Sequence, residues 1–281
     1  MNALKTALYF ILSALLIVSQ DLIASPENTP YQVYIVPQLS PLVTYQAWTP
    51  ILEKLAEKTG LKFELIVPPN IPDFEKDVNN GLPDLAFMNP YHMTIAKHRQ
   101  GYIPLVRDSA NLLEGNIVVQ KDNPIKSINE LKNQTIAFPA PNAFAATLLI
   151  RSLLAKQNIP ITPLYANTHS NVYRTVALGD VLAGGGIKNT FTREPLDIQQ
   201  QLRVLYTTPR YAPHPLAAHP RIPIKIRQEI SAAFIKLAND STNKKIFVSI
   251  QMTKPIEANY QKDYKVIEKL KFETTLTREK K

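Results

Sequence analysis

The sequence contains no cysteine among its 281 residues. Disulfide bonds, cysteine nucleophiles and a lipid-modified cysteine after a signal segment are therefore excluded. Glycine is also scarce, with 8 residues, whereas proline occurs 23 times. This balance predicts many fixed loops and no flexible low-complexity segment.

Motifs of the common catalytic sites are missing as well. The chain has no Walker loop, no G-x-G-x-x-G and no G-x-S-x-G, and its five histidines form neither H-E-x-x-H nor a zinc-ligand pattern. The glycine run 184–186 is not a nucleotide-binding motif, and we interpret it as a tight exit from a strand. The sequence therefore predicts no catalytic residue, no metal and no cofactor, and an enzyme is only a third hypothesis.

Long apolar runs are limited to the N-terminus. Lys5 precedes an apolar run from Ala7 to Val18, which has the length of a secretory signal core and is short for a membrane span. We expect residues 1–24 to be a signal peptide that is cleaved after Ala24; an uncleaved N-terminal anchor is the alternative. The protein is thus predicted to be exported to the periplasm without a lipid anchor.

The formal net charge is +9. A basic exported protein attracts anionic ligands or the anionic membrane surface. Its basic residues are dispersed, and no basic run is interleaved with aromatic residues, so nucleic acid is not an expected partner.

Strand and helix patterns alternate along the chain, which predicts an α/β fold. A first β-α-β-α-β unit spans 31–88, with a helix expected to begin at Thr49-Pro50, and a second β-α-β unit spans roughly 115–206. We therefore expect two lobes, each a mostly parallel sheet flanked by helices, with a ligand cleft between them. Lobe 1 is predicted to be 29–110, lobe 2 to be 111–211, and 212–281 to return to lobe 1, because each sheet needs both faces covered.

The most informative turn follows the short strand Thr135–Phe138. Pro139 and Pro141 end that strand, and Asn142 is a suitable N-cap for the helix pattern that begins at once. The first turn, formed by Ala143, Phe144, Ala145 and Ala146, therefore offers backbone N–H groups at the positive end of a helix. Such a turn can seat an anion, although an ordinary strand-to-helix turn has the same donors.

Two further side chains are candidates for ligand contacts. Tyr91 directly follows the buried strand 84–88, and ligands in open α/β sheets bind beyond the carboxyl ends of strands. His169 precedes another helix pattern. The alternatives are a half-buried tyrosine that covers a sheet edge and a structural histidine whose hydrogen bonds are satisfied.

The order of several segments resembles the periplasmic phosphonate- and phosphate-binding components of ABC importers over about 30–270. The segments are Trp48-Thr-Pro50, Asp84-Leu-Ala-Phe-Met-Asn-Pro-Tyr91, Ile117-Val-Val-Gln-Lys-Asp-Asn-Pro-Ile125, Phe138-Pro-Ala-Pro-Asn142, Asn167-Thr-His169, Leu178-Gly-Asp180 and Leu202-Arg-Val-Leu-Tyr206. The resemblance implies a two-lobed type II periplasmic binding protein with the phosphonate on the helix start after Asn142.

The same resemblance identifies positions where this chain departs from the family pattern. Ser/Thr hydroxyls of the helix start are replaced at Ala143, Phe144 and Ala145, and tyrosines of the ligand site are replaced at Ile71 and Leu113. Carboxylates that hold an ammonium group correspond to Asn189 and His214, whereas His169 is retained. The residues that we expect to bind the ligand are Tyr91, Asn142, Ala143, Phe144, Ala145, Ala146, His169 and His214.

Two hypotheses follow for the function. The first is a solute-binding protein for a small oxyanion such as phosphonate, phosphate or phosphite, working with an ABC permease through an altered ligand site. The alternative is a periplasmic module of the same fold that serves a membrane sensor or another partner and has no transport role.

Overall fold

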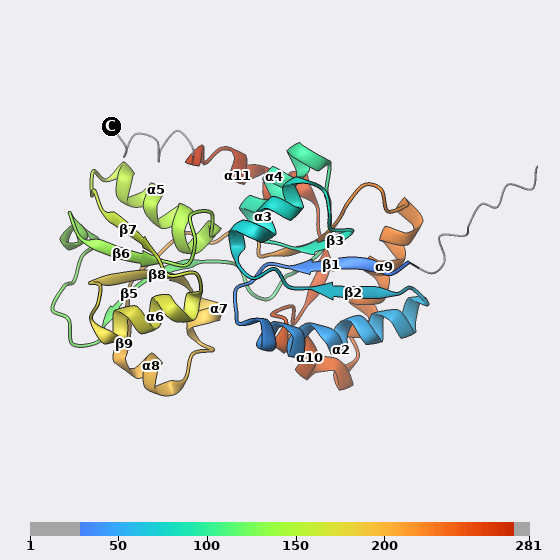
Figure 1. The fold of residues 1–281 in the computed structure, drawn as a ribbon, viewed down its shortest axis with the longest axis horizontal. Helices are drawn as coiled ribbons and strands as arrows, with labels where there is room; N and C mark the ends of the chain where they lie inside the picture. Colours follow the sequence, from blue (N-terminus) through green and yellow to red (C-terminus); the bar gives the residue numbers. More distant parts are fainter. Residues whose placement is uncertain (1–28, 273–281) are drawn as a thin grey trace, which may run out of the picture. The chain divides into compact units, whose positions relative to one another are not determined.

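The structure, a computed structural model, describes residues 29–272, and the described residues from Tyr31 onward form one compact unit. The predicted signal peptide, 1–24, lies outside the described residues, as do residues 273–281. Within the compact unit, two sheets carry helices on both faces (Figure 1). The predicted two-lobed α/β architecture is confirmed, and each lobe is one sheet with its helices.

The first lobe contains a six-stranded sheet with the order β11-β4-β10-β3-β1-β2. Its strands are β1 (Tyr31–Ile35), β2 (Phe63–Ile66), β3 (Leu85–Phe87), β4 (Ile103–Asp108), β10 (Pro215–Ala218) and β11 (Pro255–Glu257). Its helices are α2 (Pro41–Thr59), α3 (Ile71–Asn79), α4 (Pro90–Gln100), α9 (Ile224–Ala238), α10 (Lys244–Ser249) and α11 (Lys265–Glu268), with the short turns η4 (Ser241–Asn243) and η5 (Tyr260–Tyr264).

The second lobe contains a five-stranded sheet with the order β7-β6-β8-β5-β9. Its strands are β5 (Gly115–Gln120), β6 (Thr135–Phe138), β7 (Thr162–Tyr165), β8 (Ala183–Ile187) and β9 (Leu202–Thr207). Its helical segments are η2 (Ile128–Leu131), η3 (Phe144–Leu148), α5 (Leu149–Lys156), α6 (His169–Leu178), α7 (Lys188–Phe191) and α8 (Leu196–Gln201).

Both sheets are mixed and not mostly parallel as predicted, and the reason lies in the two crossings between the lobes. The chain leaves the first sheet after β4 and returns after β9. The strand after each crossing, β5 or β10, is antiparallel to both of its neighbours, whereas β1 is parallel to β2 and β3, and β6 is parallel to β7 and β8. The two crossing segments pair at Leu113 and Tyr211, each of whose N–H groups donates to the other's carbonyl at 2.9 Å. The predicted lobe boundaries at 110/111 and 211/212 stay a prediction.

Helix α2 begins earlier than the sequence pattern predicts. It starts at Pro41 after the N-cap Ser40, and Pro50 lies inside it, so the predicted start at Thr49-Pro50 is wrong. A proline inside a helix has no N–H to donate and usually bends or breaks the helix. Here Trp48 and Ile51, on either side of Pro50, are both buried, so burial of one continuous face keeps the helix intact.

The glycine run 184–186 lies within strand β8, so its interpretation as a strand exit is wrong. A Cβ atom at Gly185 would stand 2.2 Å from the Ala146 carbonyl oxygen, and one at Gly186 would stand 2.2 Å from the Tyr173 hydroxyl. Only glycine allows such a close approach. The run therefore lets the start of the η3–α5 helix and helix α6 pack directly on the strand.

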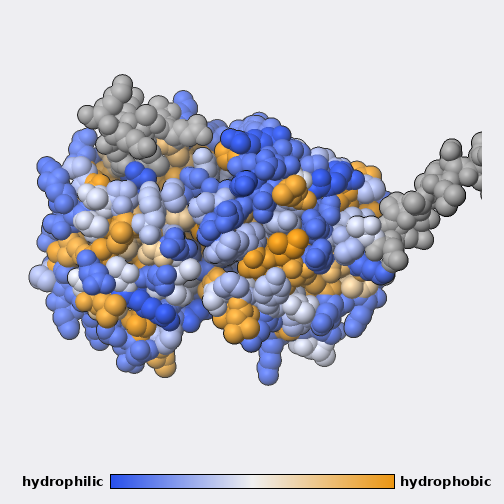
Figure 2. Space-filling model, viewed as in Figure 1, coloured by the Kyte–Doolittle hydropathy of each residue, from blue (hydrophilic) through white to orange (hydrophobic). Residues whose placement is uncertain are grey.

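The apolar core is continuous between the two lobes. The main cluster extends from β1, β3 and α2 of the first lobe to Leu113, Ala143–Ala146 and Ile187 of the second. The face of the molecule in Figure 2 is mostly hydrophilic, with separate hydrophobic patches. Over residues 29–272, none of the helices has the length and apolar character that a membrane span requires.

Candidate functional site

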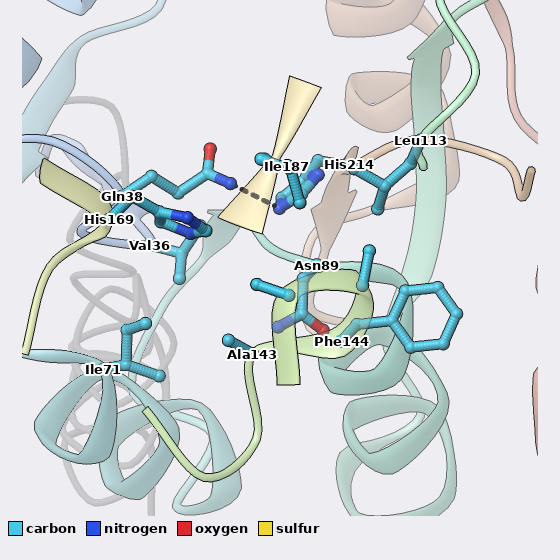
Figure 3. A pocket seen from close by; sticks show the side chains of 12 residues that line it. Val36, Gln38, Ile71, Asn89, Leu113, Ala143, Phe144, His169, Ile187 and His214 are labelled. Carbon is cyan, nitrogen blue, oxygen red and sulfur yellow. Dashed lines mark hydrogen bonds between the residues drawn. The ribbon is translucent and has the colours of Figure 1, made fainter. Parts of the chain in front are cut away.

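A small buried cavity lies where the carboxyl ends of the parallel strands from both sheets meet (Figure 3). It measures about 20 Å³. Its wall comes from residues after β1, β2, β3, β6 and β7, from the end of β8, and from residues just before β5 and β10. The lining residues are Val36, Gln38, Ile71, Asn89, Leu113, Ala143, Phe144, Ala145, Ala146, His169, Ile187 and His214.

The helix start after β6 forms one side of this cavity, and its geometry differs from the prediction. Its N-cap is Ala143, without a side-chain bond, and its first turn is a π turn over Phe144–Leu148. Asn142 is not the N-cap, because its side chain donates to Glu75 Oε2 at 3.1 Å instead. Competition from a carboxylate far away in sequence therefore overrides the local capping signal.

The first turn leaves three backbone donors without an internal partner. The earliest helical hydrogen bonds run from the N–H groups of Thr147 and Leu148 to the carbonyl of Ala143, at 2.8 and 3.2 Å. Within the described part of the chain, the N–H groups of Phe144, Ala145 and Ala146 make no hydrogen bond. Because these three residues line the cavity, they place the positive end of the helix against it.

The position of this turn is fixed by glycines on the neighbouring strands. A Cβ at Gly115 on β5 would stand 2.1 Å from the carbonyl oxygen of Ala145, and Gly185 on β8 approaches Ala146 as closely. The carbonyl groups of Ala145 and Ala146 therefore pack directly on the backbone of β5 and β8. Thr147 is fully buried and its hydroxyl donates to the Ala140 carbonyl at 2.8 Å, so it braces the turn and does not line the cavity.

His169 begins α6 and lines the cavity opposite this turn. Its side chain is 3% exposed, and its Nδ1 has no hydrogen-bond partner among the described residues. Burial lowers the pKa of His169 to about 4, so the ring is neutral at pH 7. A buried ring nitrogen without a partner is costly; Nδ1 of His92 is in the same state, but of the two histidines only His169 lines this cavity.

His214 approaches from the first lobe, just before β10. Its Nε2 lies 3.0 Å from Nε2 of Gln38 and its ring stacks on Phe87. Because the amide nitrogen of Gln38 can only donate, this contact assigns the acceptor role to Nε2 of His214. Burial lowers the pKa of His214 to about 3, with further lowering by His92 and His169, so this ring is also neutral at pH 7.

Apolar side chains fill the rest of the wall. Ile71 and Leu113, the positions that resemblance assigns to tyrosines of the ligand site, both line the cavity. Phe144 is 1% exposed and lies edge-on to Tyr211 with ring centres 5.3 Å apart. The described wall contains no Lys, Arg, Asp or Glu side chain, so any ligand charge is met by dipoles and neutral donors alone.

The structure brings six of the eight predicted site residues together: Ala143, Phe144, Ala145, Ala146, His169 and His214. Tyr91 lies outside this cavity, beside a neighbouring pocket of about 130 Å³, with its ring edge-on to Phe272. Asn142 borders the same neighbouring pocket.

Sequence reasoning missed Gln38 and Asn89. Both follow parallel strands, β1 and β3, so the rule that ligands bind beyond the carboxyl ends of strands could have found them. Asn89 also caps α4, because its Oδ1 accepts the N–H of His92 at 2.8 Å. Asn189, one of the positions that resemblance assigns to a carboxylate, does not line the cavity and donates to Gln251 at 3.0 Å.

This chain matches one known protein family in sequence and is similar in fold to many solved structures. Residues 33–264 match the family described as ABC transporter, phosphonate, periplasmic substrate-binding protein. No sequence among the curated proteins matches this chain significantly.

Several solved structures are similar in fold. The binding protein component of an ABC phosphonate transporter from Pseudomonas aeruginosa has a TM-score of 0.79 and 17% identity, covering 90% of this chain and 89% of that one. PhnD1 from Prochlorococcus marinus, in complex with methylphosphonate, has a TM-score of 0.78 and 18% identity, covering 87% and 97%. A Xanthomonas citri protein bound to ATP has a TM-score of 0.66 and 15% identity, covering 89% and 98%. At these identities the likeness concerns the fold.

Proposed function

The chain belongs to the family of periplasmic substrate-binding proteins of phosphonate ABC transporters, and from this premise we propose that it captures a small oxyanion in the cavity between its lobes. The observation that carries the proposal is the set of three unpaired N–H groups, at Phe144, Ala145 and Ala146, in the cavity wall. Such donors at a helix start attract anions without a positively charged side chain.

The site is altered from the family pattern in a way that bears on the ligand. Where resemblance implies hydroxyl donors, this chain has methyl groups and the ring of Phe144. An oxyanion oxygen that stays unpaired in a buried site costs about 1–3 kcal/mol. We therefore propose that phosphite or a short alkylphosphonate is preferred to phosphate, because each has one oxygen fewer and places hydrogen or an alkyl group against the apolar wall.

The first prediction concerns ligand capture. Thermal unfolding of the mature protein against phosphite, methylphosphonate, phosphate, sulfate and carboxylates is expected to give a stabilising shift with one of the first two. A ligand at a hundred times its Kd adds about 2.7 kcal/mol of stability, which such a measurement resolves. His169→Ala is expected to weaken that ligand roughly 10- to 100-fold through loss of one buried hydrogen bond.

The control for this prediction is His98→Ala. His98 is 63% exposed, pairs with Glu268 and does not line the cavity, so its removal should leave the affinity unchanged. If no oxyanion stabilises the wild-type protein, the capture proposal is wrong, and the alternative of a sensory or partner-interaction module gains support.

A second prediction tests the altered ligand site directly. Ala145→Ser adds a hydroxyl at the start of the helix, where it can donate to a bound oxygen. We expect phosphate affinity to rise about tenfold, corresponding to one added hydrogen bond, while affinity for the preferred ligand changes less. Ala155→Ser, in the same helix and away from the cavity, is the matched control. Equal effects of the two substitutions on phosphate binding would contradict the proposal.

We further propose that this binding takes place in the periplasm after export by residues 1–24, and that an ABC permease receives the ligand. Genes for a permease and an ATPase beside the gene for this protein would support transport. A neighbouring gene for a membrane kinase or cyclase would favour the sensory alternative.

A further inference from the structure

Asn142, next to the cavity, is one of the residues through which the two lobes are hydrogen-bonded to each other. Elsewhere, Asn189 of the second lobe donates to Gln251 of the first, and Arg193 donates to the carbonyls of Val248 and Ser249. The side-chain amide of Asn142 donates to Glu75 Oε2 at 3.1 Å, and its carbonyl accepts from Asn89 Nδ2 at 3.2 Å. Glu75 belongs to α3 and Asn89 caps α4, so both partners come from the first lobe. A residue of the second lobe is thus held at its side chain and its backbone by the first.

The partners of Asn142 are themselves fixed. Glu75 Oε1 lies 2.8 Å from His92 Nε2, and His92 is only 5% exposed. Burial opposes ionisation of Glu75, but the hydrogen bond and charge interaction with His92 and the hydrogen bond from Asn142 outweigh it and lower the pKa of this carboxyl group. Because an ionised carboxylate only accepts, Nε2 of His92 carries the proton that points at Glu75. Both oxygens of Glu75 are therefore occupied, one within its own lobe and one across the cleft.

Asn142 directly precedes the first turn of the helix, where the N–H groups of Phe144, Ala145 and Ala146 form the proposed anion seat. The next residue, Ala143, accepts the first two helical hydrogen bonds with its carbonyl, from Thr147 and Leu148. The position of Asn142 therefore sets where the first turn begins. Asn89 also lines the cavity (Figure 3), so its hydrogen bond to the Asn142 carbonyl lies at the border of the cavity.

We infer that Glu75, Asn89 and His92 form a latch that holds Asn142 when the lobes are closed, and so both retains the ligand and positions its backbone donors. Glu75 is a positioning residue, because it does not line the cavity. Loss of the latch should speed ligand release and leave capture by the open form unaffected. The release measurement rests on the proposed function, whereas closure of the lobes can be measured without any ligand.

The absence of cysteine makes the closure measurement direct. Lys58→Cys on α2 and Lys156→Cys on α5 place two spin labels on exposed residues of different lobes, and the wild-type chain offers no competing thiol. In this background, distance distributions without ligand are compared for the unaltered latch, Glu75→Gln, Asn142→Asp and the double variant E75Q/N142D. Glu57→Gln, on the exposed side of α2, is the matched control.

The expected results separate a latch from a general structural role. Asn142→Asp sets two carboxylates against each other, so a longer lobe distance should appear, and release of methylphosphonate should become roughly 10- to 100-fold faster with an association rate within about twofold. Glu75→Gln should act in the same direction but less. The double variant restores an amide facing a carboxylate. Its lobe distance and its release rate for methylphosphonate should therefore return most of the way to the wild-type values.

Unchanged distances and release rates in Asn142→Asp, or no recovery in the double variant, would overturn the latch. If neither methylphosphonate nor phosphite binds the wild-type protein, the proposed ligand is wrong, and the lobe distances alone then decide the inference.

Discussion

Lowering the pH from 7.5 to 4.5 is expected to reduce the free energy of unfolding by up to about 5 kcal/mol through two histidines alone. His169 and His214 are buried and neutral, and burial lowers their pKa values to about 4 and about 3. In the unfolded chain both return to about 6.5. Between these pH values the unfolded state binds more protons than the folded state. The free energy of unfolding is therefore highest above about pH 6.5 and falls as the pH decreases.

Urea unfolding at half-unit steps from pH 7.5 to 4.5 measures this slope, which reaches about 1.4 kcal/mol per pH unit for each histidine. His169→Gln and His214→Gln each replace an ionisable ring by a neutral amide, so each should remove about half of the slope even if it lowers stability at pH 7.5. His98→Gln is the control, because His98 is 63% exposed. A slope that is the same in all four proteins would show that other groups govern the acid sensitivity.

The helix start after β6 could be predicted from sequence, because its signals are local. Pro139 and Pro141 end the strand, and an apolar helical pattern follows at once, so a helix start at the carboxyl edge of a sheet was the expected result. The π turn was not predictable in this way. It depends on Gly115 and Gly185 of two other strands, which let the carbonyls of the turn approach the sheet.

The role of Asn142 could not be predicted for a related reason. An asparagine before a helix pattern is a good N-cap by local rules, but here Glu75, 67 residues earlier, takes its amide. Gln38 follows strand β1, but that general signal does not separate it from the residues around it; its contact with His214, 176 residues away, places it in the cavity wall. Residues whose function depends on such distant partners need the fold before they can be recognised.

Gly185→Ala is expected to damage both stability and ligand binding. The added Cβ would lie 2.2 Å from the carbonyl oxygen of Ala146 and 2.6 Å from the ring of Phe138. The carbonyl belongs to the backbone and cannot rotate away, so the η3 turn must move off the sheet. Overpacking of this kind costs about 3 kcal/mol, and displaced N–H donors should also lower ligand affinity at temperatures where the variant remains folded.

Gly184→Ala provides the matched comparison, because neighbouring residues of a strand face opposite sides of the sheet. Its Cβ would meet Val172 Cγ1 at 2.6 Å and Val176 Cγ2 at 2.8 Å on α6, away from the anion seat. This variant should lose stability and keep its ligand affinity. Adding Phe138→Leu to Gly185→Ala should relieve the ring contact only, so stability should partly recover while binding stays weak. Wild-type affinity in Gly185→Ala, measured by calorimetry on folded protein, would mean that the turn does not hold the ligand.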